Sequence, residues 1–203
     1  MALMVDGLTK MWAATSGLRP VTFNVAAGEL VVVRGRSGSG KSTLLALLAG
    51  WCSPDAGTIR YSTGADPLEW RNVAVVPQVL ALVPELTARE NVDEALHGSG
   101  ATRAARAERV RAALELLDLM ELADRPPTDT SMGQQQRTAV ARCVVAQPKV
   151  ILADEPTSHQ DAQHATTVIA ALRAAARAGS GLIVASHAEE VIAAADQVID
   201  LDL

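Results

Sequence analysis

A glycine-rich loop carries the clearest chemistry in this sequence. Residues 35–42 read GRSGSGKS and lie between an apolar run, residues 30–33, and a leucine-rich segment that begins at Leu44. This order of strand, loop and helix is the context that the pattern G-x-x-x-x-G-K-[ST] requires. The glycines let backbone N–H groups curl around phosphate oxygens, and the N-terminus of the following helix adds a partial positive charge. We therefore predict that the loop binds the phosphates of a nucleoside triphosphate.

The same loop supplies side chains as well as backbone groups. Lys41 is expected to contact the β- and γ-phosphates, and the Ser42 hydroxyl is expected to bind Mg²⁺. The predicted nucleotide-binding residues of this segment are Gly35, Arg36, Ser37, Gly38, Ser39, Gly40, Lys41, Ser42 and Thr43. Taken alone, the loop leaves kinases, GTPases and transport ATPases open as classes of protein.

Two adjacent carboxylates follow a second apolar run. Residues 150–153 read VILA and are followed by Asp154 and Glu155. In open α/β sheets, ligands bind at the carboxyl ends of the strands. Asp154 is then expected to hold Mg²⁺, directly or through a water, while Glu155 orients or deprotonates the attacking water. An acidic cap on the next helix is the alternative for this pair. A third apolar run, residues 182–185, leads to His187 beside the same site.

Composition and charge restrict the class of protein further. The 203 residues are 49% apolar and 20% charged, which is typical of one globular domain. The 23 acidic residues exceed the 18 basic ones, so nucleic acid is not an expected partner. Cys52 and Cys143 lack metal-ligand spacing and are expected to be free thiols in a reducing compartment. Because neither a signal peptide nor a long apolar run is apparent, a membrane role would need a partner.

The hydrophobic pattern predicts alternating strands and helices. We expect strands within residues 2–8 and 21–33 and at residues 58–61, 73–76, 150–153, 182–185 and 197–201. Helices are expected after the phosphate loop and near residues 134–146 and 162–178, with turns over residues 53–67. Residues 85–130 are predicted to form a mostly helical lobe, because Val110, Leu114 and Leu117 recur at helical spacing. Such alternation indicates an α/β fold with a parallel sheet covered by helices.

Further short motifs follow the phosphate loop. Pro77 and Gln78 end a strand, residues 130–137 read TSMGQQQR, residues 154–158 read DEPTS, residues 159–161 read HQD, and His187 comes last. In this order they resemble the Q-loop, the LSGGQ signature with its extension, the Walker B segment, the D-loop and the switch histidine of the ATP-binding cassette (ABC) family. The chain is thus similar to the nucleotide-binding subunit of an ABC transporter. The resemblance implies a P-loop NTPase core with a mostly parallel sheet, a small N-terminal antiparallel β part and an inserted helical lobe, all in one domain, residues 1–203.

The resemblance implies roles for single residues. Trp12 would stack on adenine, and Gln78 would contact Mg²⁺ or the attacking water and relay the nucleotide state to a membrane partner. His187 would bridge the γ-phosphate and Glu155. Across a two-fold interface, Ser131 and Gly133 would contact the ATP held by the partner subunit. The predicted nucleotide-binding set therefore adds Trp12, Ser131, Gly133, Gln134 and Asp161 to the loop. The predicted catalytic residues are Glu155, His187 and Gln78, and the predicted metal ligands are Ser42, Gln78 and Asp154.

The resemblance also implies ligands, partners and a location. ATP and Mg²⁺ are expected, with a second ABC ATPase subunit and membrane-spanning permease subunits as partners. The location would be cytoplasmic, peripheral on the inner face of the cell membrane. Residues 86–92, LTARENV, are similar to the lipoprotein-release and macrolide-export group. A non-transport ABC ATPase shares every motif and is the alternative function, whereas the DEPTS run and the signature-like segment disfavour a soluble P-loop kinase.

The signature-like segment departs from the family pattern at two positions. Thr130 stands where the family usually has Leu, and Met132 stands where it has the first Gly. Met132 places a side chain where the backbone normally approaches the γ-phosphate closely. Our hypothesis is that hydrolysis survives, because Glu155 and His187 are both present. A degenerate cassette that binds ATP without hydrolysing it is the other interpretation.

Overall fold

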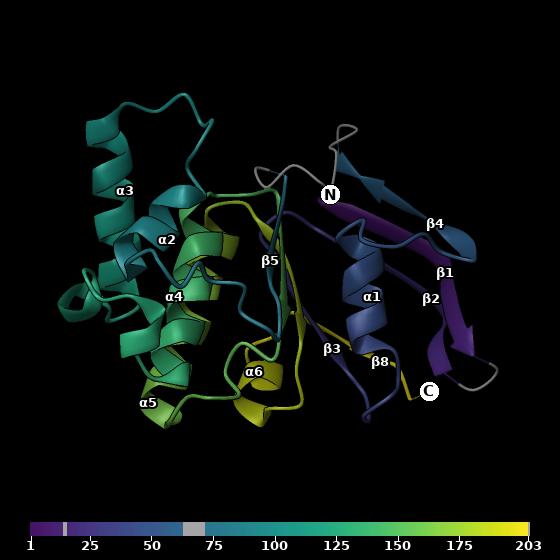
Figure 1. The fold of residues 1–203 in the computed structure, drawn as a ribbon. Helices are drawn as coiled ribbons and strands as arrows, with labels where there is room; N and C mark the ends of the chain where they lie inside the picture. The colour runs from purple at the N-terminus through teal and green to yellow at the C-terminus, as the bar shows by residue number, and fades with distance from the viewer. Residues whose placement is uncertain (14–15, 63–71, 203) are drawn as a thin grey trace.

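A computed structural model describes residues 1–13, 16–62 and 72–202, and its strands form two sheets (Figure 1). The smaller sheet is antiparallel, in the order β2-β1-β4. Its strands are β1 (Leu3–Ala13), β2 (Ser16–Val25) and β4 (Ala56–Tyr61). Residues 63–67 of the predicted turn region lie outside the described residues. The sheet confirms the small N-terminal antiparallel part, and β1 runs far enough to include Trp12.

The larger sheet has five parallel strands in the order β5-β6-β7-β3-β8. They are β3 (Leu30–Arg34), β5 (Val73–Val76), β6 (Val150–Asp154), β7 (Gly181–Ala185) and β8 (Gln197–Asp200). Four of these strands, β3, β5, β6 and β7, are almost wholly buried, as their apolar runs predict for a sheet that is covered on both faces. The predicted α/β fold with a mostly parallel sheet is confirmed.

Alternate side chains of β3 enter two different cores. Val31 and Val33 pack with α1 and the antiparallel sheet, whereas Leu30 and Val32 pack with the helices of the opposite face. Helix α1 (Lys41–Leu48) contacts β6 and β7 on one side and β2 on the other. This sandwich places the loop that precedes α1 at the carboxyl edge of the parallel sheet.

Helices cover the other face of the sheet, and those within residues 88–116 form the lobe at the left of Figure 1. The helices of this face and the lobe are α2 (Ala88–Glu94), α3 (Arg103–Leu116), α4 (Met132–Val145), α5 (Ala162–Arg177) and α6 (Glu189–Ala193), with two 3₁₀ turns at Met120–Leu122 and Pro127–Asp129. Helix α4 contacts α2, α3, α5 and β5, so it joins the lobe to the sheet. It begins two residues before the predicted start, because Ser131 caps it in a reciprocal capping box with Gln134.

The buried side chain of Asn91 fixes the entry to the lobe. Its amide nitrogen donates to the carbonyl oxygens of Val83, Leu86 and Thr87, and its oxygen accepts the Val83 N–H.

Both cysteines are free thiols, and burial raises the pKa of the Cys143 thiol to about 12. Among the helices in the described part of the chain, none combines the length and apolar character needed to cross a membrane.

Candidate active site

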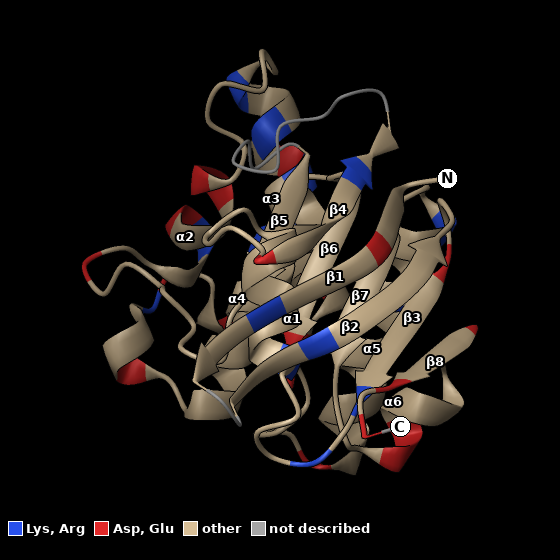
Figure 2. Ribbon diagram, turned by 90° about the vertical axis from the view of Figure 1, so that its right-hand side faces the viewer, with Lys and Arg blue, Asp and Glu red and all other residues tan. Residues whose placement is uncertain are grey.

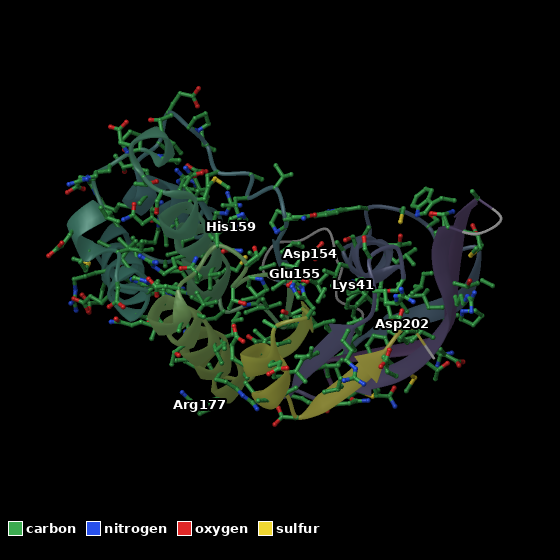
Figure 3. The ribbon with its side chains drawn as sticks, turned by 90° about the horizontal axis from the view of Figure 1, so that it is seen from below. Lys41, Asp154, Glu155, His159, Arg177 and Asp202 are labelled. Atoms are coloured by element: carbon green, nitrogen blue, oxygen red, sulfur yellow. The ribbon has the colours of Figure 1, made fainter. Side chains whose placement is uncertain are left out.

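The carboxyl ends of four neighbouring parallel strands surround one open pocket of about 700 Å³. The loop after β3, the residue pair at the end of β6, and segments after β5 and β7 all reach it, which is where ligands bind in open α/β sheets. The predicted residues that line it are Gly35, Arg36, Ser37, Gly38, Gly40, Lys41, Ser42, Thr43, Gln78, Asp154, Glu155 and His187. Lys41, Asp154 and Glu155 lie together in Figure 3.

The loop between β3 and α1 needs its glycines for backbone shape. Gly38 and Gly40 have φ angles of +85° and +100°, which favour glycine. A Cβ atom on Gly40 would lie 2.7 Å from the carbonyl oxygen of Gly17. The Lys41 ammonium donates to the carbonyl oxygens of Gly35 at 2.6 Å and Arg36 at 3.1 Å. The lysine thus spans the loop and places a positive charge at the pocket.

A hydroxyl and a carboxylate meet beside the lysine. Ser42 Oγ donates to Asp154 Oδ2 at 2.9 Å. Burial raises the pKa of Asp154, and the hydrogen bond from Ser42 opposes that rise. Together with the Gln78 amide in the same pocket, these groups are the oxygen donors that Mg²⁺ prefers. In the described part of the chain, no group of three or more His, Cys, Asp or Glu side chains could hold a metal ion. The Ser42, Asp154 and Gln78 oxygens fit a Mg²⁺ that keeps several water and phosphate ligands.

Glu155 is held from several directions. Its backbone has φ +48°, and its N–H donates to the carbonyl oxygen of Ala185 at 2.9 Å. Oε1 of its carboxylate lies 2.7 Å from Nδ1 of His187, and Oε2 accepts from Ser186 Oγ at 3.1 Å. The glutamate side chain is 17% exposed and the histidine side chain 79%. The geometry presents a fixed carboxylate to the pocket, with the histidine ring beside it.

Several predicted nucleotide-binding residues do not line this pocket: Trp12, Ser39, Ser131, Gly133, Gln134 and Asp161. Trp12 is 59% exposed, and its Nε1–H donates to Thr43 Oγ1 at 3.1 Å, which ties the ring to the pocket rim. Asp161 caps helix α5 by accepting the His164 N–H. The signature-like residues cluster at the start of α4, where a Cβ atom on Gly133 would lie 2.6 Å from the His159 carbonyl oxygen.

The pocket also contains residues outside the predicted site set, namely Ser16, Gly17, Ser158 and His159. Gly17 reaches it because the β1–β2 hairpin packs directly against the phosphate loop at Gly40. No local signal marks that contact. Ser158 and His159 follow the acidic pair within the same loop, so their short distance along the chain was a usable signal.

This sheet, with its phosphate loop and acidic strand end, defines a nucleoside-triphosphate-binding protein of the P-loop type. A model of the family described as ABC transporter matches residues 18–158, and the chain belongs to that family. An uncharacterized ABC transporter ATP-binding protein of Mycobacterium tuberculosis is 39% identical over 196 residues, covering 91% of this chain and 59% of the relative. The chain therefore spans about 59% of the length of that relative.

Other relatives and solved structures agree with this assignment. The macrolide export ATP-binding/permease protein MacB of Brucella melitensis is 37% identical, covering 93% of this chain and 30% of MacB. The sulfate/thiosulfate import ATP-binding protein CysA of Thermosynechococcus vestitus is 40% identical, covering 80% of this chain and 49% of CysA. A dimeric ABC transporter cassette superposes with a TM-score of 0.86 at 28% identity, covering 98% of this chain and 93% of the cassette. A dimeric post-hydrolysis state of a cassette with bound ADP and Pi gives a TM-score of 0.85 at 27% identity, covering 98% of this chain and 93% of that chain.

Proposed function

We propose that this chain hydrolyses ATP in a Mg²⁺-dependent reaction and drives transport through membrane-spanning partners. The observation that carries the proposal is the fixed carboxylate of Glu155, which faces the same pocket as the phosphate loop. An attacking water must be oriented and must lose a proton as it adds to the γ-phosphorus, while the bond from that phosphorus to the oxygen that leaves with ADP breaks. Glu155 would orient the water and accept its proton, and His187 would hold the Glu155 carboxylate.

The remaining pocket residues bind and polarise the substrate. Backbone N–H groups of the loop and the Lys41 ammonium would surround the β- and γ-phosphates. Ser42, Asp154 and Gln78 would hold Mg²⁺, which neutralises charge that develops on the phosphate oxygens. Trp12 would stack on the adenine ring, because its exposed indole is tied to the pocket rim through Thr43.

A second cassette would complete the site. Ser131 and Gly133 do not line their own chain's pocket, although the family resemblance gives them contacts with ATP. A two-fold dimer resolves this, because each chain then offers its signature-like residues to the nucleotide of the other. The similarity to solved dimeric cassettes supports the pairing. ATP between the two chains would hold the dimer, and hydrolysis would release it.

Permease subunits are the membrane partners that we propose, with the chain peripheral on the cytoplasmic face. The names of the relatives support this, since MacB is an export ATP-binding/permease protein and CysA an import ATP-binding protein. The helical lobe beside Gln78 would be the docking region. Acidic and basic residues are interspersed along the ribbon in Figure 2, which favours a protein partner over nucleic acid.

Mg²⁺-dependent phosphate release is the direct test. Purified protein at high concentration is expected to convert ATP to ADP and phosphate with Mg²⁺, to stop when excess EDTA is added, and to resume when Mg²⁺ is restored. The reason is that Ser42 and Asp154 would hold a Mg²⁺ whose charge adds to that of Lys41 and Arg36 in neutralising the phosphates. Phosphate release that EDTA leaves unchanged would contradict the metal assignment, and ATP binding without release would favour the binding-only cassette.

Met132 lies at the first position of α4 with 50% of its surface exposed, on the segment that would face the partner's ATP. We expect Met132→Gly to raise kcat a few-fold, because it removes the side chain that limits close approach of the backbone. Met132→Ala keeps helix propensity and should give an intermediate rise. Steady-state hydrolysis at several protein concentrations measures the effect. If neither variant hydrolyses ATP faster than the parent, the Met132 side chain does not limit the approach of the signature-like segment to the partner's ATP.

A further inference from the structure

One buried glutamine of α4, Gln136, forms hydrogen bonds with the backbone of residues 155–159, a segment that begins at Glu155. Gln136 is 2% exposed and lies near the end of the signature-like segment, on helix α4. Its Nε2 donates to the carbonyl oxygen of Glu155 at 2.7 Å, and its Oε1 accepts the His159 N–H at 3.2 Å. A single buried amide is thus hydrogen-bonded to both ends of residues 155–159. Burial makes these contacts significant, because each group would otherwise lack its partner inside the protein.

Residues 155–159, to which Gln136 is hydrogen-bonded, include a backbone conformation that is uncommon for a glutamate. Glu155 has φ +48°, a left-handed geometry in which non-glycine residues are uncommon. Such a conformation persists only where surrounding contacts determine it. The carboxylate is held from the end of β7 by Ser186 and His187. The backbone carbonyl oxygen of the same residue accepts from Gln136 Nε2 and from the Ser158 N–H, the latter at 3.2 Å.

We propose that Gln136 is a positioning residue for ATP hydrolysis, which sets the direction of the Glu155 carboxylate by fixing the backbone of residues 155–159. The inference rests on the proposed function, since it assigns a support to the residue that acts on water. Gln136 does not line the pocket, so it contacts neither the nucleotide nor the metal donors. Gln136 affects the orientation of the Glu155 carboxylate. Loss of its hydrogen bonds should therefore lower kcat and leave nucleotide affinity nearly unchanged.

A second contact connects the same helix to the segment that follows Glu155. Gln160 Nε2 donates to the Gly133 carbonyl oxygen at 2.8 Å, and its Oε1 accepts from Arg137 at 2.9 Å. The start of α4 and residues 155–160 are therefore joined by side-chain amides in both directions. The position of the signature-like residues, which would touch the partner's ATP, is thereby linked to the direction of Glu155 within one chain.

The test replaces Gln136 by methionine, which has similar volume but neither contact. We expect kcat to fall by about 10- to 100-fold, since a small misplacement of a catalytic group has effects of this size. The KM for ATP should stay within about threefold, because the pocket lining is unchanged. Hydrogen–deuterium exchange without nucleotide should show faster exchange of the His159 amide, which loses its acceptor.

Gln135→Met is the matched control. It makes the same chemical change one residue earlier, where the amide donates to the carbonyl oxygens of Pro127 and Thr130. Its loss of kcat should be clearly smaller than that of Gln136→Met, because neither bond reaches residues 155–159, although Thr130 belongs to the signature-like segment. Equal losses of kcat in both variants would mean general loosening of α4 and would overturn the inference. A Gln136→Met protein with parental kcat would overturn it as well.

Two further outcomes are distinguishable: a Gln136→Met protein that does not fold, and a parent protein that does not hydrolyse ATP. If Gln136→Met does not fold, Gln136→Asn keeps the amide but withdraws it by one methylene, and a several-fold loss of kcat at unchanged KM is still expected; parental kcat overturns the inference. If the parent protein itself releases no phosphate from ATP, the proposed function is wrong, and so is the role of Gln136 in setting kcat. The exchange of the His159 amide then still reports whether Gln136 holds the segment.

Discussion

Glu155→Gln is expected to lower kcat for ATP hydrolysis by about 100- to 10,000-fold, the range found when a general base is lost. The amide has nearly the same size and can keep the contact with Ser186, but it cannot take a proton from water. ATP should still bind, because the phosphate loop is unchanged. Since hydrolysis would open the proposed dimer, dimers should accumulate with ATP. Phosphate release and size-exclusion chromatography with and without ATP measure both effects.

Glu189→Gln provides the control for the loss of one negative charge. Glu189 is exposed in the first turn of α6, two residues beyond His187, and does not line the pocket. Its substitution should leave kcat close to that of the parent. If Glu155→Gln retains most of the parental turnover, the catalytic carboxylate lies elsewhere. If it loses turnover without forming dimers, the catalytic role stands and the paired-site arrangement fails.

Lys41→Met is expected to weaken ATP binding by about 30- to 5,000-fold, which corresponds to the 2–5 kcal/mol lost when one partner of a buried charged contact is removed. The substitution also removes both hydrogen bonds that span the loop, to the carbonyl oxygens of Gly35 and Arg36. Loss of a fixed charge and loss of loop shape therefore act in the same direction. Isothermal titration calorimetry with ATP measures the change in Kd.

Lys149→Met serves as its control, because Lys149 is an exposed lysine that precedes β6 and does not line the pocket. Its Kd for ATP should match that of the parent. Lys41→Arg separates charge from shape, since it keeps the positive charge on a larger, planar group. We expect it to bind ATP more tightly than Lys41→Met does. An unchanged Kd in Lys41→Met would mean that the loop does not hold the phosphates.

The parts of the fold that follow from short-range patterns could be predicted well. Apolar runs such as residues 150–153 predicted the strands of the parallel sheet, because strands buried on both faces need apolar side chains on both sides. Boundaries were less certain: the capping box of Ser131 and Gln134 was a usable signal for the start of α4. The short helix α6 has too few residues to show a period and was not predicted.

By itself, the sequence determined the α/β class, the phosphate loop and the candidate acidic and histidine residues, because each depends on neighbours a few positions apart and on the rule that strand ends meet at one edge. The tertiary structure alone decided which residues converge. It placed Gly17 against the loop, left Ser131 outside the pocket, and set the buried Gln136 amide on the Glu155 backbone. Such contacts depend on how hairpins and helices pack across large separations in the chain, and no local spacing encodes that packing.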